Sequence, residues 1–317
     1  MNIGFVGTGT MGNPMARCLI DAEHQDREHG DEGHRVTVHD LRRESTTNLC
    51  ELGAVWADSP RAVAEASEVV FTSLPGPIEV ERVVLDPSQG ILAGLATGSA
   101  YIDMTTNSPD TSRRVAEACR ARGIEMLDAP VSGRPPGMTI MAGGEKATFE
   151  RYLPVLESMG GNIFYVGGAG SGCIAKLVTQ YLGYTNFITA LEGLLIGAKA
   201  GIDLNTLAQI VPVSAGASRV FDNIPRAVLS GEFTSGGTLD IVAKDVHLAC
   251  ELARDVLAPC FTGAIADDVF QRAQAQGWGQ EGFPTAARIL ELMAGVELRA
   301  AGSGYNTGYQ QDDPRAA

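Results

Sequence analysis

Residues 3–12 read Ile-Gly-Phe-Val-Gly-Thr-Gly-Thr-Met-Gly, an apolar, strand-like run that leads into a turn with three spaced glycines. In such a turn Gly7 permits the tight bend, Gly9 lets backbone approach a pyrophosphate, and Gly12 lets the following helix pack closely on the strand. The N-terminus of that helix adds unpaired N–H groups and partial positive charge. The pattern predicts dinucleotide contacts at Gly7, Thr8, Gly9, Thr10, Met11 and Gly12.

A second strand-like run, Val36–His39, leads directly into Asp40. An acidic residue at this place usually binds the ribose hydroxyls of the adenosine, so we expect cofactor contacts at Asp40, Leu41 and Arg42. A carboxylate here repels the 2′-phosphate of NADP, whereas Arg42 and Arg43 could pair with that phosphate. The charge pattern therefore favours NAD and leaves NADP open.

The stretch Asp21–Gly33, between the first predicted helix and this strand, is rich in acidic residues and has no apolar periodicity. It is predicted to be a surface insertion. Histidines recur every five residues, at His24, His29, His34 and His39, but neither a helix nor a strand places that spacing on one face. We therefore predict a solvated loop here and no metal site.

Composition limits the classes of function. The 317 residues are 44% hydrophobic and 20% charged, enough for a sizeable core divided between two domains. The net charge of −14 argues against binding to nucleic acid or to anionic membranes, so local groups must hold an anionic substrate. Six cysteines are scattered without a Cys-x-x-Cys pair, and no long apolar run or signal peptide is recognised. These features predict a cytoplasmic protein.

Strand and helix patterns alternate in the first half of the chain and predict an α/β fold, a Rossmann-type doubly wound, mostly parallel sheet. The expected strands are Ile3–Gly7, Val36–His39, Val69–Ser73, Ala100–Asp103, Ile124–Asp128 and Asn162–Val166. After the glycine run at 167–172 only helical spacing follows, at Ile174–Ala200, Leu204–Pro212, Leu239–Leu257 and Ala264–Gln276. We predict a dinucleotide-binding domain at 1–167, an all-α domain at 168–301 for substrate and dimerisation, and a disordered tail at 302–317.

Five stretches together resemble the β-hydroxyacid dehydrogenase family, whose members include 3-hydroxyisobutyrate dehydrogenase and tartronate semialdehyde reductase. They are Gly4–Ala16, Asp103–Pro109 (Asp-Met-Thr-Thr-Asn-Ser-Pro), Asp128–Gly133 (Asp-Ala-Pro-Val-Ser-Gly), Gly170–Lys176 (Gly-Ser-Gly-Cys-Ile-Ala-Lys) and Lys244–Ala249. The resemblance spans nearly the whole chain. It implies an NAD- or NADP-dependent enzyme that exchanges a hydride with a small 3-hydroxy acid, and a homodimer or homotetramer.

Lys176 is the predicted general acid and base. It lies about one turn into an apolar helix, where desolvation lowers the pKa of a lysine toward the range useful for taking a proton from an alcohol. A surface lysine on an amphipathic helix is the alternative, and the resemblance favours catalysis because the family's catalytic lysine matches Lys176. Gln180, four residues on, faces the same side and would orient the amine or the substrate hydroxyl.

The substrate and the rest of the cofactor are assigned to loops that follow the strands. Ser132 and Gly133 come after a strand, and the resemblance implies that they hold the substrate carboxylate. Further cofactor contacts are predicted at Leu74 and Pro75, in a carboxyl-end turn, and at Thr106 and Lys244, which match family residues. Without the resemblance, Lys244-Asp245 would be interpreted as a solvated charge pair.

The chain departs from the family pattern at three places. Arg134 stands where a second glycine is usual, and the segment after it is about five residues shorter than usual. Arg134 would add a bidentate contact to an anion or fill space meant for a smaller substituent. Gln180 replaces the usual asparagine, which keeps the amide and lengthens its reach.

Two other functions stay open. An imine reductase on the same scaffold is one, although such relatives commonly carry a different residue at the position of Lys176. A non-catalytic NAD-binding sensor or scaffold is the other, and the retention of Lys176, Ser132 and Lys244 together weighs against it. The 6-phosphogluconate dehydrogenases resemble the chain more distantly and carry His-Asn where Thr179-Gln180 stands here, so decarboxylation is not favoured.

Overall fold

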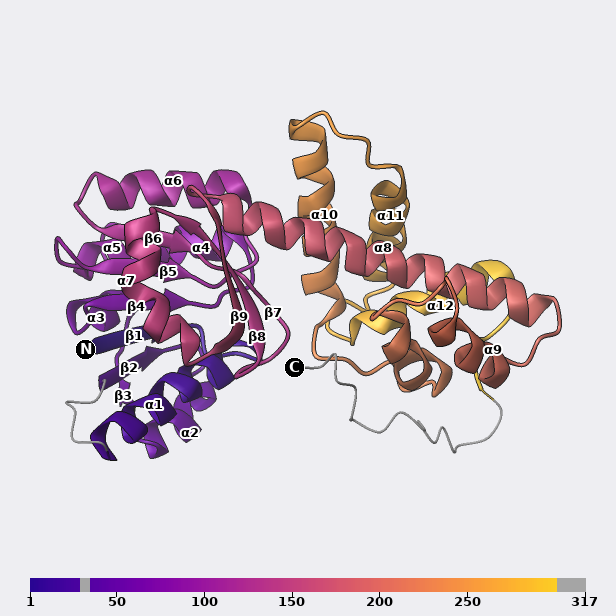
Figure 1. Ribbon diagram of the computed structural model, residues 1–317, viewed down its shortest axis with the longest axis horizontal. Helices are drawn as coiled ribbons and strands as arrows, with labels where there is room; N and C mark the ends of the chain where they lie inside the picture. The colour runs from indigo at the N-terminus through magenta and orange to yellow at the C-terminus, as the bar shows by residue number, and fades with distance from the viewer. Residues whose placement is uncertain (29–34, 301–317) are drawn as a thin grey trace. The chain divides into compact units, whose positions relative to one another are not determined.

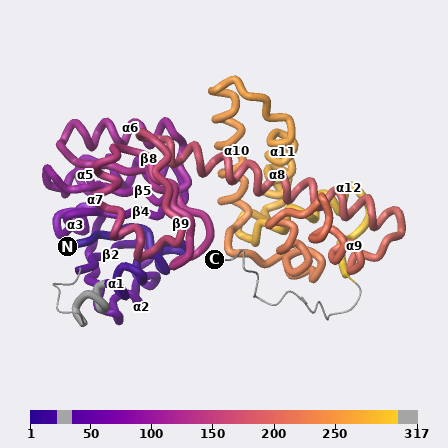
Figure 2. Tube along the Cα trace, in the orientation of Figure 1, coloured from indigo at the N-terminus to yellow at the C-terminus, as the bar shows by residue number. Residues whose placement is uncertain are grey.

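The computed structural model describes residues 1–28 and 35–300 and divides into two compact units, Met1–Thr179 and Gln180–Ala317. The division falls within one long continuous helix, α8 (Ser171–Lys199), which can be followed in Figure 2. The boundary expected at residue 167 stays a prediction, and the tail expected at 302–317 lies outside the described residues.

The N-terminal unit is built on one mostly parallel sheet (Figure 1). Its described strands are β1 (Asn2–Val6), β2 (Arg35–His39), β3 (Val55–Trp56), β4 (Val69–Thr72), β5 (Ala100–Asp103), β6 (Glu125–Asp128), β7 (Val131–Ser132), β8 (Met138–Gly144) and β9 (Gly160–Gly167). They are arranged in the order β3-β2-β1-β4-β5-β6-β8-β7, with β9 beside β8. Only the pairs β6–β8 and β7–β8 are antiparallel. The predicted α/β class is confirmed.

The sheet has an apolar core on each of its two faces. Alternating side chains point to opposite faces of a strand, so Ile3 and Phe5 enter one core while Val6 enters the other. Helices α1 (Gly12–Glu28), α2 (Thr47–Glu51) and α7 (Lys146–Glu157) contribute to the first core. Helices α3 (Pro60–Glu65), α4 (Pro77–Leu85), α5 (Ile91–Gly94) and α6 (Pro109–Arg120) contribute to the second. A short 3₁₀ turn, Arg43–Thr46, precedes α2.

The predicted acidic insertion is partly wrong, because α1 continues through Glu28 instead of ending near residue 20. The stretch contains several residues of high helix propensity, and Arg17 pairs with Asp21 at 3.5 Å across one turn, and both features favour a helix. Residues 29–34, with two of the four regularly spaced histidines, lie outside the described residues. His39 is buried beside Trp56 and within 2.9 Å of the Ala57 carbonyl oxygen.

The C-terminal unit is all-helical, as predicted. After α8 it contains α9 (Leu204–Ile210), α10 (Leu239–Asp255), α11 (Phe261–Ala275) and α12 (Ala287–Ala294), with short 3₁₀ or π segments at Val211–Val213, Phe221–Asn223, Pro225–Leu229 and Phe283–Ala286. Its core is centred on aromatic side chains, and Phe187 stacks on Phe270 and meets Phe283 edge-on. Helix α12 was not predicted.

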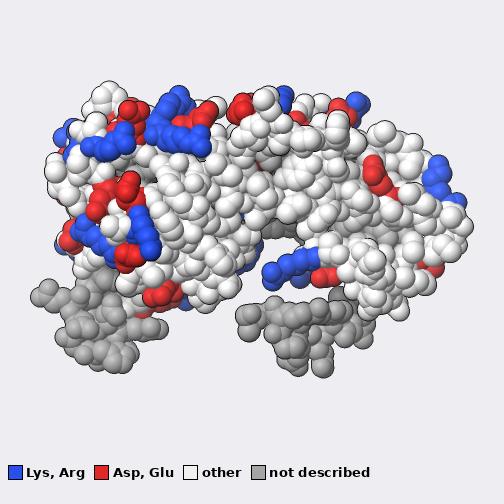
Figure 3. All heavy atoms as spheres, turned by 45° about the horizontal axis from the view of Figure 1, so that its top comes forward, with Lys and Arg blue, Asp and Glu red and all other residues white. Residues whose placement is uncertain are grey.

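Charge is spread in small groups of mixed sign on the face shown in Figure 3. On α6, for example, Arg113 pairs with Asp110 at 3.0 Å and Arg120 with Glu117 at 3.8 Å. Exposed pairs of this kind are worth little stability. In the described parts of the chain, no helix has the length and apolar character needed to cross a membrane.

Candidate active site

The ends of five strands lie in one row and define the edge where the predicted ligand loops begin. The register pairs Val6 with His39 and with Thr72, Thr72 with Asp103, and Asp103 with Asp128. The loops that leave these positions carry the predicted cofactor residues of this unit. Ligands of doubly wound sheets bind at the carboxyl ends of the strands, so the topology supports the predicted location.

The glycine turn is held by its own packing. The Gly7 N–H donates to the His39 carbonyl at 2.9 Å, and Gly7 has a φ of +92°, which favours glycine. A Cβ added at Gly12 would overlap the Gly7 carbonyl oxygen, whereas one added at Gly9 would meet nothing within 4 Å. The fold itself therefore requires Gly7 and Gly12, while Gly9 leaves space for a ligand.

The side chain of Asp40 is hydrogen-bonded to that turn. Its Oδ2 accepts the Thr8 N–H at 2.8 Å, and its Oδ1 accepts the Arg42 N–H at 2.9 Å. Leu41 is 94% exposed, and the Arg43 guanidinium lies over the Trp56 ring at 5.3 Å. The carboxylate and the dinucleotide turn thus form one hydrogen-bonded unit.

Asp103 organises the next loop. It is fully buried and accepts from the Thr72 hydroxyl at 2.8 Å, from the Thr105 N–H at 3.1 Å and from the Asn107 amide at 3.1 Å. The Thr105 hydroxyl in turn accepts the Leu74 N–H at 3.0 Å. Burial raises the pKa of Asp103. Sequence reasoning placed Leu74, Pro75 and Thr106 at the cofactor but did not assign Asp103, which holds Thr105 and, through its hydroxyl, Leu74.

The predicted carboxylate-binding turn belongs to a hairpin. Ser132 ends β7 and is the register partner of Thr139 in β8, and Gly133 follows with a φ of +86°. Arg134 is exposed. Both strands were missed, and β7, with two residues, is too short a pattern to recognise from spacing.

Lys176 is 6% exposed, so the alternative of a surface lysine is wrong.

The helix that carries Lys176, α8, is held at its beginning by Asp128 of β6. The Asp128 carboxylate accepts the Gly170 N–H at 2.7 Å and the Cys173 N–H at 2.9 Å. Burial raises the pKa of Asp128 to about 6, against the opposing effect of these two N–H groups. This contact joins residues more than forty positions apart and was not predicted.

In the C-terminal unit, Asp245 joins two predicted site residues. Its Oδ2 accepts from the Gln180 amide at 2.5 Å, and its Oδ1 pairs with the Lys244 amine at 2.9 Å. Asp245 is 2% exposed, so Lys244-Asp245 is not a solvated pair. The Gln180 amide also lies 3.3 Å from the Tyr184 hydroxyl. Asp245 belongs to the Lys244–Ala249 stretch, but no local sequence feature indicated that its carboxylate would bind Gln180 and Lys244.

Both parts of the chain match known family models. Residues 2–167 match the NAD binding domain of 6-phosphogluconate dehydrogenase, and residues 170–290 match the model described as NAD-binding of NADP-dependent 3-hydroxyisobutyrate dehydrogenase. Two relatives are similar over most of their length. The 3-hydroxyisobutyrate dehydrogenase of Pseudomonas aeruginosa is 36% identical, covering 86% of this chain and 93% of the relative. The 2-(hydroxymethyl)glutarate dehydrogenase of Eubacterium barkeri is 33% identical, covering 94% and 97%.

The chain belongs to the β-hydroxyacid dehydrogenase family. The crystal structure of a 3-hydroxyisobutyrate dehydrogenase from Salmonella typhimurium has a TM-score of 0.80 and 29% identity, covering 91% of this chain and 99% of that one. This member of the family is therefore an NAD(P)-dependent oxidoreductase of the 3-hydroxyacid dehydrogenase type.

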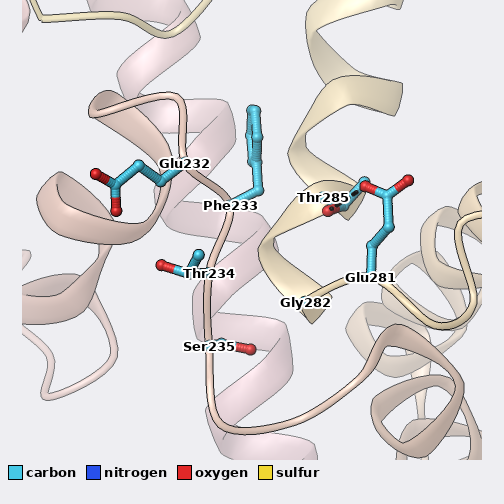
Figure 4. Close-up of a pocket in the computed structure, with 7 residues that line it drawn as sticks. All are labelled: Glu232, Phe233, Thr234, Ser235, Glu281, Gly282 and Thr285. Atoms are coloured by element: carbon cyan, nitrogen blue, oxygen red, sulfur yellow. Dashed lines mark hydrogen bonds between the residues drawn. The ribbon is translucent and has the colours of Figure 1, made fainter.

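A separate pocket in the helical unit does not have the character of this family's substrate site. It is lined by Glu232, Phe233, Thr234, Ser235, Glu281, Gly282 and Thr285 (Figure 4). It contains none of the predicted site residues, and Glu281 in its lining is paired with Arg288 at 3.2 Å. No group of His, Cys, Asp and Glu in the described residues is arranged to hold a metal ion.

Proposed function

We propose that this dehydrogenase oxidises a small 3-hydroxy acid similar to 3-hydroxyisobutyrate, serine or glycerate, or reduces the matching semialdehyde or ketone, with NAD as the favoured cofactor. The observation that carries the proposal is the buried Lys176. A buried lysine amine beside a bound alcohol has the chemistry of a general acid and base. The two curated relatives support the substrate class, because both are named for acids with a hydroxyl on the β carbon.

The cofactor would be held by the glycine turn and by Asp40. The open space at Gly9 leaves room for a pyrophosphate, and the carboxylate beside Thr8 suits a ribose diol better than a 2′-phosphate. Leu74, Pro75, Thr106 and Lys244 would complete the contacts. When bound, the nicotinamide accepts the hydride from the substrate carbon.

The chain's own residues would supply position and a proton. The Lys176 amine takes the hydroxyl proton as the alcohol becomes a carbonyl and returns it in the reverse direction. The Gln180 amide, fixed by Asp245, orients the amine or the hydroxyl. The Ser132 hydroxyl and the Gly133 N–H hold the carboxylate, and the exposed Arg134 offers a second contact to an anion.

Replacement of Lys176 tests this proposal. In a panel of 3-hydroxy acids with NAD or NADP, followed by the absorbance of the reduced nicotinamide, Lys176→Ala should lower kcat by about 10² to 10⁴-fold, the usual contribution of general acid–base catalysis. Cofactor binding should be retained. Lys199→Ala is the matched control, because Lys199 is an exposed lysine at the end of the same helix. Equal activity in both variants would refute the role of Lys176.

We also propose that the enzyme works in the cytoplasm as a homodimer or homotetramer. The helical unit exposes large apolar side chains, among them Ile196 at 72%, Leu292 at 71% and Met293 at 75%. Apolar surface of this kind is often covered by a partner subunit. Light scattering on the protein as it elutes from a size-exclusion column should give the mass of two or four chains. The mass of one chain would refute the assembly.

A further inference from the structure

Two buried aspartates end neighbouring strands at the edge of the sheet where the predicted ligand loops begin. Their carboxylates accept hydrogen bonds from different parts of the chain. Asp103 and Asp128 are register partners and both are 0% exposed. Asp103 holds groups of the β4 and β5 ends, as described above. Asp128 instead reaches the beginning of α8, more than forty residues later in the chain.

Helix α8 begins without a capping side chain of its own. The Ile174 N–H donates to the Gly170 carbonyl at 3.0 Å, which makes Gly170 the residue at the N-cap position. The first N–H groups of a helix have no partner within it, and a Ser, Thr, Asp or Asn at the N-cap normally accepts from one of them. Gly170 has no side chain to do so. Asp128 supplies the missing acceptors, one oxygen to Gly170 and one to Cys173.

Glycines bring the backbones around Asp128 into direct contact. A Cβ on Gly172 would overlap the carbonyl oxygens of Asp128 and Met141. A Cβ on Gly143 would lie 2.7 Å from the Gly172 nitrogen and 2.8 Å from Asp128 Oδ1. Strands β6 and β8 and the start of α8 therefore meet with no intervening side chain. Backbones packed this closely cannot shift relative to one another without overlap.

Lys176 lies three residues after Cys173, on the same side of the helix and about 4.5 Å further along its axis. Any shift of the anchored first turn moves the lysine with it. We propose that Asp128 is a positioning residue for hydride transfer, because it caps α8 and so fixes the place of the Lys176 amine. This inference rests on the proposed role of Lys176.

The ionised form of Asp128 makes the better cap. Burial, with a smaller contribution from the charge of Asp103 of β5, raises the pKa of its carboxyl to about 6. The other titratable group that faces it is the Cys173 thiol of α8, whose pKa burial raises, while β8 presents only Gly143. As the pH falls through about 6 the carboxyl gains a proton, and one acceptor opposite an N–H is lost. The cap, and with it kcat, should therefore decline below that pH.

The test compares Asp128→Asn with Asp103→Asn, two substitutions of equal size at buried register partners. Asp128→Asn places an amide NH₂ against a backbone N–H and should lower kcat by about 10- to 100-fold with the KM for cofactor changed by less than about threefold. In the reduction direction, where the protonated Lys176 amine is the active form, the decline of kcat near pH 6 should disappear. Asp103→Asn should mainly raise the KM for cofactor, because its partners hold the loop beside Leu74.

Hydrogen–deuterium exchange gives a readout that does not depend on turnover. The amides of residues 170–177 should exchange faster in Asp128→Asn than in the wild type, and should be unchanged in Asp103→Asn. Thermal unfolding of both variants controls for a general loss of stability. Unchanged kcat in folded Asp128→Asn, or an equal loss of kcat in both variants, would overturn the positioning role. A wild type that oxidises no 3-hydroxy acid would instead refute the proposed function, while exchange would still report on the cap.

Discussion

The two loops that we assign to cofactor and substrate are built in opposite ways. In the glycine turn after β1, a side chain at Gly7 or Gly12 would overlap neighbouring backbone. In the β7–β8 hairpin, a Cβ on Gly133 would have its nearest neighbour at 3.7 Å, and one on Gly137 would meet nothing within 4 Å. The first loop is fixed by the interior of the protein, and the second has free space around it.

This difference matches two of the three departures that the sequence suggests, Arg134 and the shortened segment after it, which both fall in the hairpin. The cofactor turn serves one ligand class, and its geometry is tied to the packing of α1 on the sheet, so its residues cannot vary without cost. Gly133 is still required by its φ of +86°, but the neighbouring Arg134 is exposed, so the side chain at that position can change without rearranging the fold. Substrate preference can therefore change while the cofactor site stays intact.

Of the substitutions that test this comparison, Gly12→Ala should cause the largest change in free energy. Gly12→Ala places a methyl group against the Gly7 carbonyl and should cost about 3 kcal/mol of stability, near the upper range for overpacking. Gly9→Ala is the matched control, since its methyl group enters open space. It should unfold at the wild-type temperature yet bind cofactor at least about tenfold more weakly, if the pyrophosphate occupies that space. Thermal unfolding and cofactor titration measure the two effects, and equal melting temperatures would contradict the packing argument.

A smaller effect is expected at Asp40. Asp40→Asn removes the charge that repels a 2′-phosphate and keeps one oxygen for a backbone N–H. The ratio of kcat/KM for NAD to that for NADP should fall about tenfold, equivalent to roughly 1.4 kcal/mol. Initial rates with each cofactor at one substrate concentration measure it. A ratio that does not move would remove Asp40 from the determinants of cofactor choice.

The smallest effect is expected at Arg134. Arg134→Gly restores the residue usual in the family and should leave stability within about 0.5 kcal/mol, because the side chain is exposed. The KM for a 3-hydroxy acid with a second carboxylate should rise about three- to tenfold, while that for a monocarboxylate changes little. Equal KM changes for the two acids would show that Arg134 does not read a second anionic group.

Much of the fold was predictable because its signals are local. The Gly7, Gly9 and Gly12 spacing identified the dinucleotide turn, and alternation of strand and helix patterns identified the sheet. Several of the exceptions are short, although β8 and α12 are longer and were also missed. Strands β3 and β7 have two residues each, and the end of α1 runs through a stretch of sequence with no apolar periodicity.

The sequence by itself determined the fold class, because the strand and helix patterns and the glycine turn are local, and its resemblance to the family pointed to Lys176. Tertiary structure decided which carboxylates support them. Asp128 caps α8 across more than forty residues, and Asp245 binds Gln180 across sixty-five. A buried carboxylate needs hydrogen-bond donors that only the folded chain brings within reach, and no local pattern records such a pairing.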